Sequence, residues 1–348
     1  MPSGPTNSVL DVNGVGLGHA TVHRDEPDPP DGRGVARTGV TVLMIADDAF
    51  TRLVPAGGAV LNGAGECTGF ITAAECGILE TPICLTSTLQ LGRVYDAACE
   101  LMLEEHPEVA EDFIIPVVAE CDDSFLNDAR RMQVTRDDVA AAWAHARESR
   151  GSDTPPDEGS VGSGTGMSCL GFKGGIGTAS RITGEGHTVA VLLMTNFGER
   201  HRLTVDGVPV GRLLPAVPGE PAPRPPAGSC IGIAVTDAAV DGAGCARLAR
   251  RIGLGLARTG SVAHNGSGEI FMGCATGLRL DRQGEYEATR PMSLRALDPL
   301  FEAVVEASEE AVLNSMLASR TTVGRGGNVS EGLPVEQVVR LLGEHGRL

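Results

Sequence analysis

The chain has 348 residues, of which 42% are hydrophobic, so it can bury a substantial core as one large domain or two ordinary ones. Its formal net charge of -17 argues against nucleic acid or an anionic membrane surface as a partner, because both need a basic face. It has no apolar run of about 18 residues and no basic, apolar leader, so we expect a cytoplasmic protein. Its nine cysteines form no C-x-x-C pair, which indicates buried free thiols.

The first third of the chain reads as strands separated by glycine-rich turns. Residues 9–23 alternate and turn at glycines, which predicts an opening hairpin, and residues 26–34 predict a surface loop. Residues 39–46 predict a buried strand. The small, glycine-rich stretch 57–77 predicts backbone that closely approaches another part of the molecule. Apolar residues at helical spacing then predict a helix over 94–105.

The middle of the chain continues this alternation. Residues 112–118 predict a buried strand, and Thr135 with Asp138 form a pattern close to a capping box that opens a helix. Residues 147–166, rich in glycine, serine and proline, predict a flexible loop. Residues 188–196 predict an apolar strand that ends at Asn196.

The last third predicts a strand to residue 236, a helix over 243–258 and a strand over 268–275. A long helix follows, with Asp298 as N-cap before a proline, and only Ser308 interrupts its apolar stripe. Strands and helices interleave with no repeat and no long linker. We therefore predict one α/β domain over 1–348, in which two packed sheets are sheathed by helices as a four-layer αββα sandwich.

The most informative junction is Gly228-Ser229. The proline-rich run 221–226, which can form neither helix nor central strand, stops just before it, and a β-branched run starts just after it. Gly228 leaves its peptide bond to Ser229 approachable. We hypothesise that the chain cuts itself there and that Ser229 becomes an N-terminal nucleophile; the alternative is an ordinary loop entering a buried strand.

Such a serine needs no histidine. Its own α-amine has an ordinary pKa of about 7.7 to 8 and can accept the hydroxyl proton. The chain has no G-x-S-x-G, H-E-x-x-H or P-loop motif, and its eight histidines are too dispersed to propose a metal site. We expect His264 to be a hydrogen-bonded loop or strand-end residue, and Cys230, which would point away from Ser229, to be a packing residue.

Three further polar residues could support Ser229. On a strand, Ser267 and Glu269 project to the same face, opposite Ile270 and Met272, and could relay protons. The alternative is a polar strand end that faces solvent. Asn196 could donate its side-chain amide to an oxyanion, or it could simply initiate a turn.

Eight spaced motifs in a common order resemble the L-aminopeptidase/D-esterase (DmpA-type) and β-peptidyl aminopeptidase family. They cover most of the chain from Val9 to Pro334: 37–42 (RTGVTV), 60–69 (VLNGAGECTG), 77–86 (GILETPICLT), 126–128 (LND), 164–167 (GTGM), 172–181 (FKGGIGTASR), 228–229 (GS) and 265–269 (NGSGE).

This resemblance implies an αββα sandwich of the DmpA/ornithine acetyltransferase-like kind, cut into an α chain (1–228) and a β chain (229–348) that assemble as homo-oligomers of αβ units. It implies an N-terminal-nucleophile serine aminopeptidase or amidase without a cofactor, acting on short peptides, amides or esters with α-, β- or D-amino acids. By motif, Ser229 takes the place of the nucleophile, Ser267 and Glu269 that of its supporting pair, and Asn196 that of the oxyanion donor.

One segment departs from the family pattern. Some members place a tyrosine hydroxyl at the site from the stretch that here reads ECDDSFLND, residues 120–128, where this chain has Phe125. We predict that this loop shapes the substrate pocket through Glu120, Asp122, Phe125 and Asn127. Its acidic residues Asp122 and Asp123 could attract a substrate ammonium group or could be solvated. The alternatives to a hydrolase are an acyltransferase on the same scaffold, which would usually present threonine as nucleophile, and an inactive binding scaffold.

Overall fold

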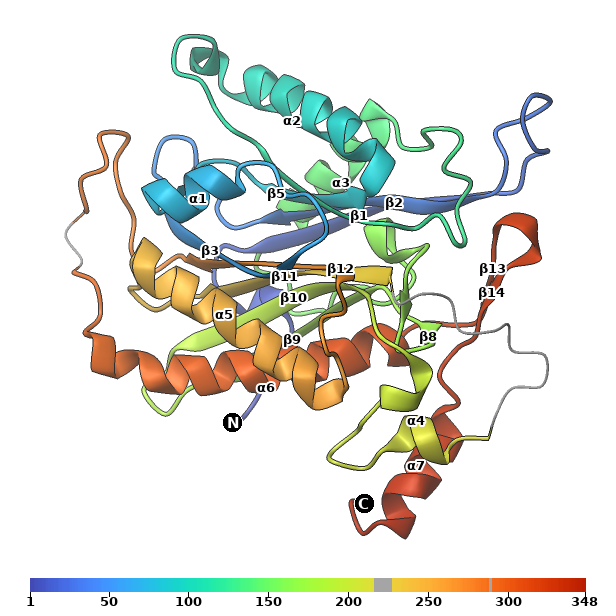
Figure 1. Ribbon diagram of the computed structural model, residues 1–348. Helices are drawn as coiled ribbons and strands as arrows, with labels where there is room; N and C mark the ends of the chain where they lie inside the picture. Colours follow the sequence, from blue (N-terminus) through green and yellow to red (C-terminus); the bar gives the residue numbers. More distant parts are fainter. Residues whose placement is uncertain (216–226, 288–289) are drawn as a thin grey trace.

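Two β-sheets lie face to face at the centre of the molecule, and helices cover both outer faces (Figure 1). The computed structural model describes residues 1–215, 227–287 and 290–348, so the proline-rich run 221–226 lies outside the described residues. The four-stranded sheet has the order β1 (Gly16–Arg24), β2 (Ala36–Met44), β5 (Ile83–Ser87), β6 (Val117–Cys121). The six-stranded sheet has the order β4 (Ile78–Leu79), β3 (Val54–Gly63), β12 (Gly266–Ala275), β11 (Ala227–Thr236), β10 (Thr188–Asn196), β9 (Ile176–Ile182).

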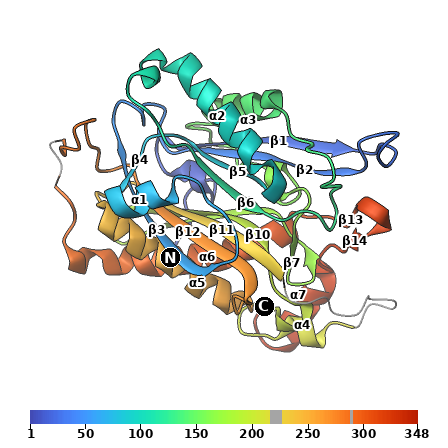
Figure 2. The same cartoon turned by 45° about the horizontal axis from the view of Figure 1, so that its top comes forward.

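The described residues also form helices and two short strand pairs (Figure 2). The α-helices are α1 (Phe70–Cys76), α2 (Leu91–Glu105), α3 (Arg136–Glu148), α4 (Val210–Leu213), α5 (Gly242–Thr259), α6 (Asp298–Leu317) and α7 (Val335–Glu344). The short pairs are β7 (Ser168–Cys169) with β8 (Phe172–Lys173), and β13 (Thr322–Val323) with β14 (Val329–Ser330). Among the described residues, no helix combines the length and the apolar character needed to cross a membrane.

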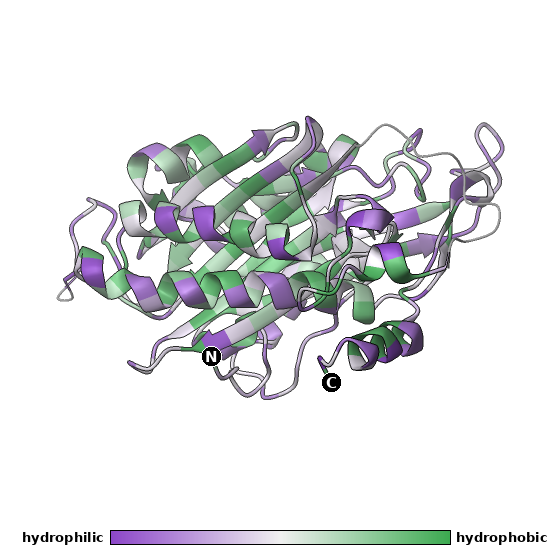
Figure 3. Cartoon of the chain, turned by 60° about the horizontal axis from the view of Figure 1, so that its bottom comes forward, coloured by the Kyte–Doolittle hydropathy of each residue, from purple (hydrophilic) through white to green (hydrophobic). Residues whose placement is uncertain are grey.

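Three hydrophobic cores separate the four layers. One lies between α2–α3 and the four-stranded sheet, one between the two sheets, and one between the six-stranded sheet and α5–α6. The apolar run of β10 serves two of them, because Val191 and Leu193 face the α5–α6 core while Leu192 and Met194 face the core between the sheets. Accordingly, Figure 3 shows long hydrophobic runs along the strands and mixed hydropathy on the helices that cover them. The predicted αββα sandwich is confirmed in its layers.

The interruption of the α6 stripe has a packing reason. Ser308 is fully buried and faces α5, where a methyl group on Gly255 would lie 2.5 Å from the Ser308 Cβ. Two small residues therefore let α5 and α6 approach closely. The predicted N-cap is shifted by one residue, since Asp298 is already helical and the short 3-10 turn Leu294–Leu297 precedes it.

Most predicted elements are confirmed, including the buried strand β2, the helices α2 and α5, and the capping box at Thr135 and Asp138. The opening hairpin within 9–23 is wrong, because β1 is one strand whose partner is the distant β2. The strand predicted over 112–118 starts only at Val117, after Pro116, which cannot donate to a ladder. The loop 147–166 is irregular, but its short turn Gly162–Gly164 is buried against β2.

Candidate active site

Ser229 lies on β11, in the middle of the six-stranded sheet. Antiparallel pairing with β10 places it directly opposite Asn196, and parallel pairing with β12 places it beside Gly268. Gly268 lies between Ser267 and Glu269 in the chain. Side chains that are directly opposite on neighbouring strands have Cβ atoms about 5 Å apart. The sheet register thus gathers at one place four residues that the sequence predicted as catalytic but spread over 74 positions of the chain.

Position 228 requires a glycine because β10 and β11 approach each other closely there. The strand begins at Ala227, before the junction and not after Ser229 as predicted, so the Gly228-Ser229 peptide bond lies inside β11. Gly228 is not among the glycines with positive φ. A methyl group at this position would instead lie 2.4 Å from the backbone oxygen of Asn196 and 3.0 Å from Cα of Phe197. The glycine therefore brings the candidate scissile bond against the end of β10.

Ser267 and Glu269 form a hydrogen-bonded pair, in which the Ser267 hydroxyl donates to Glu269 Oε1 at very short range. Both side chains are buried, and Glu269 Oε2 has no hydrogen-bond partner among the described residues. Burial raises the pKa of Glu269, and the Ser267 hydrogen bond counteracts part of that rise. A carboxylate in this state can receive a proton through Ser267.

The turn before Ser267 is held from β3. Asn62 Nδ2 faces the carbonyl oxygens of His264 at 3.1 Å and Asn265 at 3.2 Å, and also that of Ser267. The register between β12 and β3 shifts between Glu269 and Ile270, where β3 carries Leu61 as an extra residue. Ile270 and Met272 face the core between the sheets.

The Asn196 amide has a fixed orientation. Its Oδ1 accepts the backbone N–H of Ser168 at 3.0 Å, and its Nδ2 donates one hydrogen to the carbonyl of Asp122 at 2.8 Å. An amide nitrogen carries two hydrogens. The second N–H therefore stays available on the strand position opposite Ser229.

The Ser229 hydroxyl is buried between the sheets. Its oxygen has no hydrogen-bond partner of good geometry among the described residues. The Cys121 thiol lies close to the Ser229 hydroxyl. Burial raises the pKa of this thiol, and its contact with Ser229 offsets part of that rise. A thiol is only a weak hydrogen-bonding group, so the serine oxygen remains free to attack. Cys230 packs in the opposite core, as predicted.

Glu120 lies at the edge of this site. Its carboxylate accepts the backbone N–H of Glu66 at 2.9 Å and the Thr88 hydroxyl at shorter range. A methyl group on Gly65 would lie 3.3 Å from Glu120 Oε1 and 3.7 Å from Cα of Gly268, so the carboxylate is close to β12. Burial raises the pKa of Glu120, while these two hydrogen bonds oppose the rise.

The loop after Glu120 is braced from within. The Asp122 side chain is exposed and accepts the backbone N–H and the hydroxyl of Ser124, whereas Asp123 is buried. Asn127 is 1% exposed and uses both ends of its amide, accepting the backbone N–H of Arg37 and donating to Asp123. Phe125 is half-buried. Asp123 is therefore neither solvated nor able to reach a substrate, and Asn127 acts on the loop.

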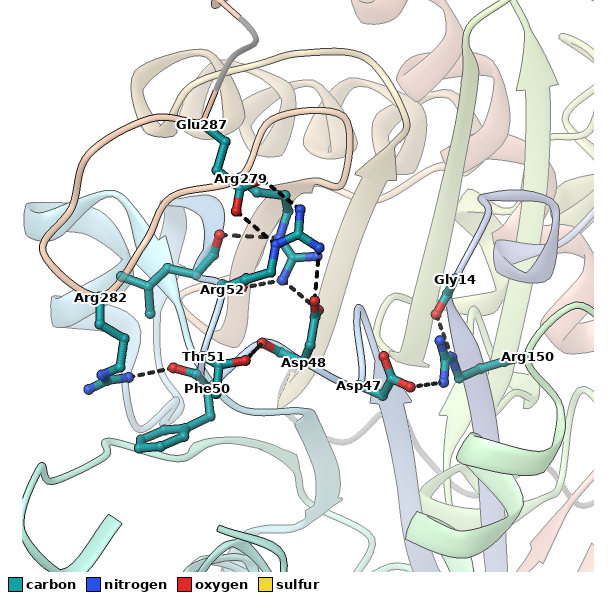
Figure 4. A network of polar contacts seen from close by, with 11 residues as sticks. Gly14, Asp47, Asp48, Phe50, Thr51, Arg52, Arg150, Arg279, Arg282 and Glu287 are labelled. Atoms are coloured by element: carbon teal, nitrogen blue, oxygen red, sulfur yellow. Dashed lines mark hydrogen bonds and ion pairs between the residues drawn. The ribbon is translucent and has the colours of Figure 1, made fainter. Parts of the chain in front are cut away.

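A second polar region lies at the far end of the sheet (Figure 4). A cavity of about 430 Å³ there is lined by Asp237, which directly follows β11, and by Asp47, Asp48, Arg52, Arg150 and Arg279. Asp237 lies eight positions after Ser229, a distance of about 26 Å at about 3.3 Å per residue of extended chain. The arginines are committed to ion pairs, including Arg279 with Asp48 at 2.7 Å and Arg52 with Glu287 at 2.6 Å. This cavity is separate from the candidate active site.

Other side chains near the site have structural partners. His264 Nε2 lies 3.4 Å from Glu199 Oε2, which agrees with its prediction as a bonded loop residue. Within the described ranges, no three His, Cys, Asp or Glu side chains are grouped as metal ligands would be. Sequence reasoning assigned no role to Asn62, Cys121 or Ser168, although the first lies in a quoted motif and the second directly follows Glu120.

Comparisons with known proteins agree with this geometry. The sequence model of peptidase family S58 matches residues 7–330. The β-peptidyl aminopeptidase BapA of Sphingosinicella xenopeptidilytica is 36% identical over 97% of this chain and 87% of its own length.

Solved structures align over the whole fold. The L-aminopeptidase D-Ala-esterase/amidase of Ochrobactrum anthropi, whose structure is a variant of the Ntn hydrolase fold, has a TM-score of 0.89 and 33% identity, covering 100% of this chain and 96% of that one. The PH0078 protein of Pyrococcus horikoshii OT3 has a TM-score of 0.89 and 38% identity, with 99% and 96% covered. The fold is thus the Ntn hydrolase variant that the sequence predicted, and the chain belongs to peptidase family S58.

Proposed function

We propose that the chain cuts itself between Gly228 and Ser229 and then acts as an N-terminal-nucleophile serine aminopeptidase or amidase. Cleavage gives an α chain, 1–228, and a β chain, 229–348. The observation that carries the proposal is the register of β11, in which Ser229 pairs with Asn196 on one side and, on the other, with Gly268, which lies between the hydrogen-bonded Ser267 and Glu269. We infer that this is a site for acyl transfer to a serine hydroxyl.

The first reaction makes the catalyst. The Ser229 hydroxyl attacks the Gly228 carbonyl carbon while Ser267, backed by Glu269, receives its proton. The tetrahedral intermediate collapses by breaking the Gly228–Ser229 C–N bond, and the Ser229 nitrogen takes a proton. Water then hydrolyses the resulting Gly228 ester, which releases the hydroxyl and leaves a free α-amine on Ser229.

The mature enzyme repeats this chemistry on substrates. The Ser229 α-amine accepts the hydroxyl proton, the oxygen attacks the substrate carbonyl, and the second N–H of Asn196 donates to the oxyanion. The leaving amine takes a proton, and water resolves the acyl-enzyme. In the uncut chain the Gly228 carbonyl occupies the position of the substrate carbonyl, which is why departure of residues 227–228 vacates the acyl site.

We propose that substrates are short peptides, amides or esters with a free amino group, in keeping with the relatives named for β-peptidyl and D-alanyl substrates. The Glu120 carboxylate is the group best placed to receive that ammonium ion, because it is buried beside β12. Phe125 forms part of the pocket wall in place of a tyrosine. Asp122 and Asn127 support the wall from behind, through Asn196 and Asp123 respectively.

We further propose that cut αβ units form a homo-oligomer. Large apolar side chains are exposed on α1, β3 and α5, at Ile71, Leu61 and Leu254, which are 77%, 56% and 57% exposed. Exposed apolar surface of this kind favours association. Sedimentation of the wild type as a single αβ unit at all concentrations would contradict this.

The catalytic proposal is tested with p-nitroanilides of L-alanine, D-alanine and β-alanine. The wild type releases nitroaniline from at least one of them, whereas Ser229→Ala releases none. Asn196→Ala, which removes one oxyanion donor, lowers kcat by about 10²–10³-fold. Transfer of the acyl group to an added amine in preference to water would favour the acyltransferase. Cut protein that hydrolyses none of these substrates and is not labelled by a serine-acylating probe would favour a binding scaffold.

A further inference from the structure

The only lysine of the chain is buried near Asn196. Lys173 on β8 has 0% exposure. Its Nζ donates to three backbone carbonyls, those of Gly164 at 3.1 Å, Met167 at 2.7 Å and Gly174 at 2.7 Å. Within the described part of the chain it forms no ion pair. A buried charge without a counter-ion is costly, so its presence at this place calls for a functional explanation.

The contacts indicate that Lys173 is an ammonium ion. Burial lowers the pKa of Lys173 to about 7. Three carbonyl oxygens within 3.1 Å nevertheless require three N–H donors, and only the charged form supplies three. A neutral amine would direct its lone pair at one of these oxygens. The geometry therefore favours the charged form in the folded protein.

One of the three carbonyls leads directly to the Asn196 amide. The carbonyl of Met167 and the N–H of Ser168 belong to the same peptide group. Lys173 donates to that carbonyl, and the Ser168 N–H donates to Asn196 Oδ1 at 3.0 Å. An unbroken line of hydrogen bonds thus runs from the ammonium ion through one peptide group to the side chain opposite Ser229.

We propose that Lys173 is a positioning residue that orients and polarises the Asn196 amide for oxyanion binding. This inference rests on the proposed role of Asn196. Hydrogen bonds in a chain strengthen one another, because each donor that is polarised becomes a better donor to the next group. A cation at the start of the line draws electron density from the Met167-Ser168 peptide and, through Asn196 Oδ1, makes the free N–H more acidic.

The buried charge also gives the site a fixed positive field. Among the described residues, the partners of Lys173 Nζ in the resting protein are three neutral carbonyls, so the charge that complements it is the oxyanion that forms next to Ser229. Such preorganised charge in a water-poor site stabilises the transition state without reorganisation. Lys173 touches no reacting atom and enters no covalent step.

Two neutral variants separate charge from hydrogen bonding. Lys173→Met removes both, and Lys173→Gln keeps two N–H donors without the charge. We expect each variant to lower kcat of the cut enzyme at least tenfold and to keep KM within twofold of the wild type. This loss of kcat is smaller than the loss of about 10²–10³-fold expected for removing an oxyanion donor. Self-cleavage, followed by denaturing mass spectrometry, slows by a similar factor. Should Lys173→Met fail to fold, the polar Lys173→Gln still provides the test.

A double-mutant cycle shows whether Lys173 acts through Asn196. In an Asn196→Ala background the loss caused by Lys173→Gln shrinks to less than threefold in self-cleavage rate. The matched control is Ser319→Ala, which removes a neutral donor from the same Gly174 carbonyl and keeps both kcat and the self-cleavage rate within threefold. Wild-type kcat in Lys173→Gln, or losses that multiply fully with Asn196→Ala, would overturn the inference. A wild-type chain that neither cuts nor hydrolyses would instead refute the function on which it rests.

Discussion

Replacing Gly228 with alanine tests why the strand pairing matters for self-cleavage. The added methyl group would lie 2.4 Å from the Asn196 backbone oxygen and 3.0 Å from Cα of Phe197. A carbon and an oxygen need about 3.4 Å, so β10 and β11 must move apart by about 1 Å at the scissile bond. Both obstructing atoms are backbone, which cannot rotate away as a side-chain end can.

The expected effect is confined to processing. A displacement of 1 Å between reacting groups costs about 100-fold in rate, so we expect Gly228→Ala to cut itself about 100-fold more slowly than the wild type. Once the chain is cut, the substituted residue is the end of the α chain and is no longer held against the end of β10. The kcat of the cut fraction therefore equals that of the wild type.

The assay is a time course of intact mass under denaturing conditions, with kcat measured per mole of cut protein. The matched control is Gly232→Ala in the same strand, where the methyl group meets only side-chain atoms, the nearest being those of Ile252 and Leu193, both at 2.9 Å. Flexible side chains can yield, so its self-cleavage stays within about threefold of the wild type. Self-cleavage of Gly228→Ala at the wild-type rate would show that the β10–β11 distance does not control the reaction.

Three further outcomes follow from the site. Glu269→Gln, which cannot take up a proton, lowers the self-cleavage rate by about 10²–10⁴-fold, and an unchanged rate would exclude Glu269 as the proton acceptor of that step. Glu120→Gln raises KM for amine-bearing substrates at least tenfold, whereas Asp122→Asn leaves KM unchanged, because only the Glu120 carboxylate lies beside β12. Equal KM values for the two variants would exclude Glu120 as the ammonium site. Burial raises the pKa of Asp123 to about 7, so between about pH 4 and pH 7 the folded state holds a proton that the unfolded state has released, and stability falls as pH rises. Asp123→Asn thus flattens the pH dependence of stability and stabilises the protein at pH 8 by up to about 4 kcal/mol, measured by urea unfolding in the uncut Ser229→Ala background. Part of the pH dependence remains, because burial raises the pKa of Glu158 to about 7 as well. An unchanged pH dependence would contradict the burial of the Asp123 charge.

The sequence predicted correctly those helices and strands that are determined by neighbouring residues in the chain. The helix α2, the capping box at Thr135 and the apolar strand β10 follow from periodicity and caps that a window of a few residues contains. The layer order followed from the alternation of strands and helices. Errors arose where a distant segment decides, as at 9–23, where the partner strand β2 lies beyond a surface loop.

In the candidate site, too, the sequence indicated which residues take part but not how they are placed. Residue types and motifs were enough to select Ser229, Ser267, Glu269 and Asn196. Their mutual placement depends on two long-range pairings of β11, one antiparallel and one parallel, and no local pattern encodes a register. For Gly228, sequence reasoning anticipated an approachable peptide bond, and the structure adds a close approach to β10 that no local pattern contains.

Buried polar partners were the hardest to foresee. Asn62 and Lys173 act on carbonyl oxygens, and every residue has one, so the sequence carries no mark of the contact. Asp123 looked like a second surface acid beside Asp122, yet alternate residues of an irregular loop point in opposite directions.

The most direct test of self-cleavage at Ser229 is the intact mass of the purified protein under denaturing conditions, beside Ser229→Ala. We predict two fragments in the wild type that meet between Gly228 and Ser229, and one uncut chain in the variant. A single full-length wild-type chain after long incubation would contradict the mechanism, because no α-amine would then exist to activate the serine.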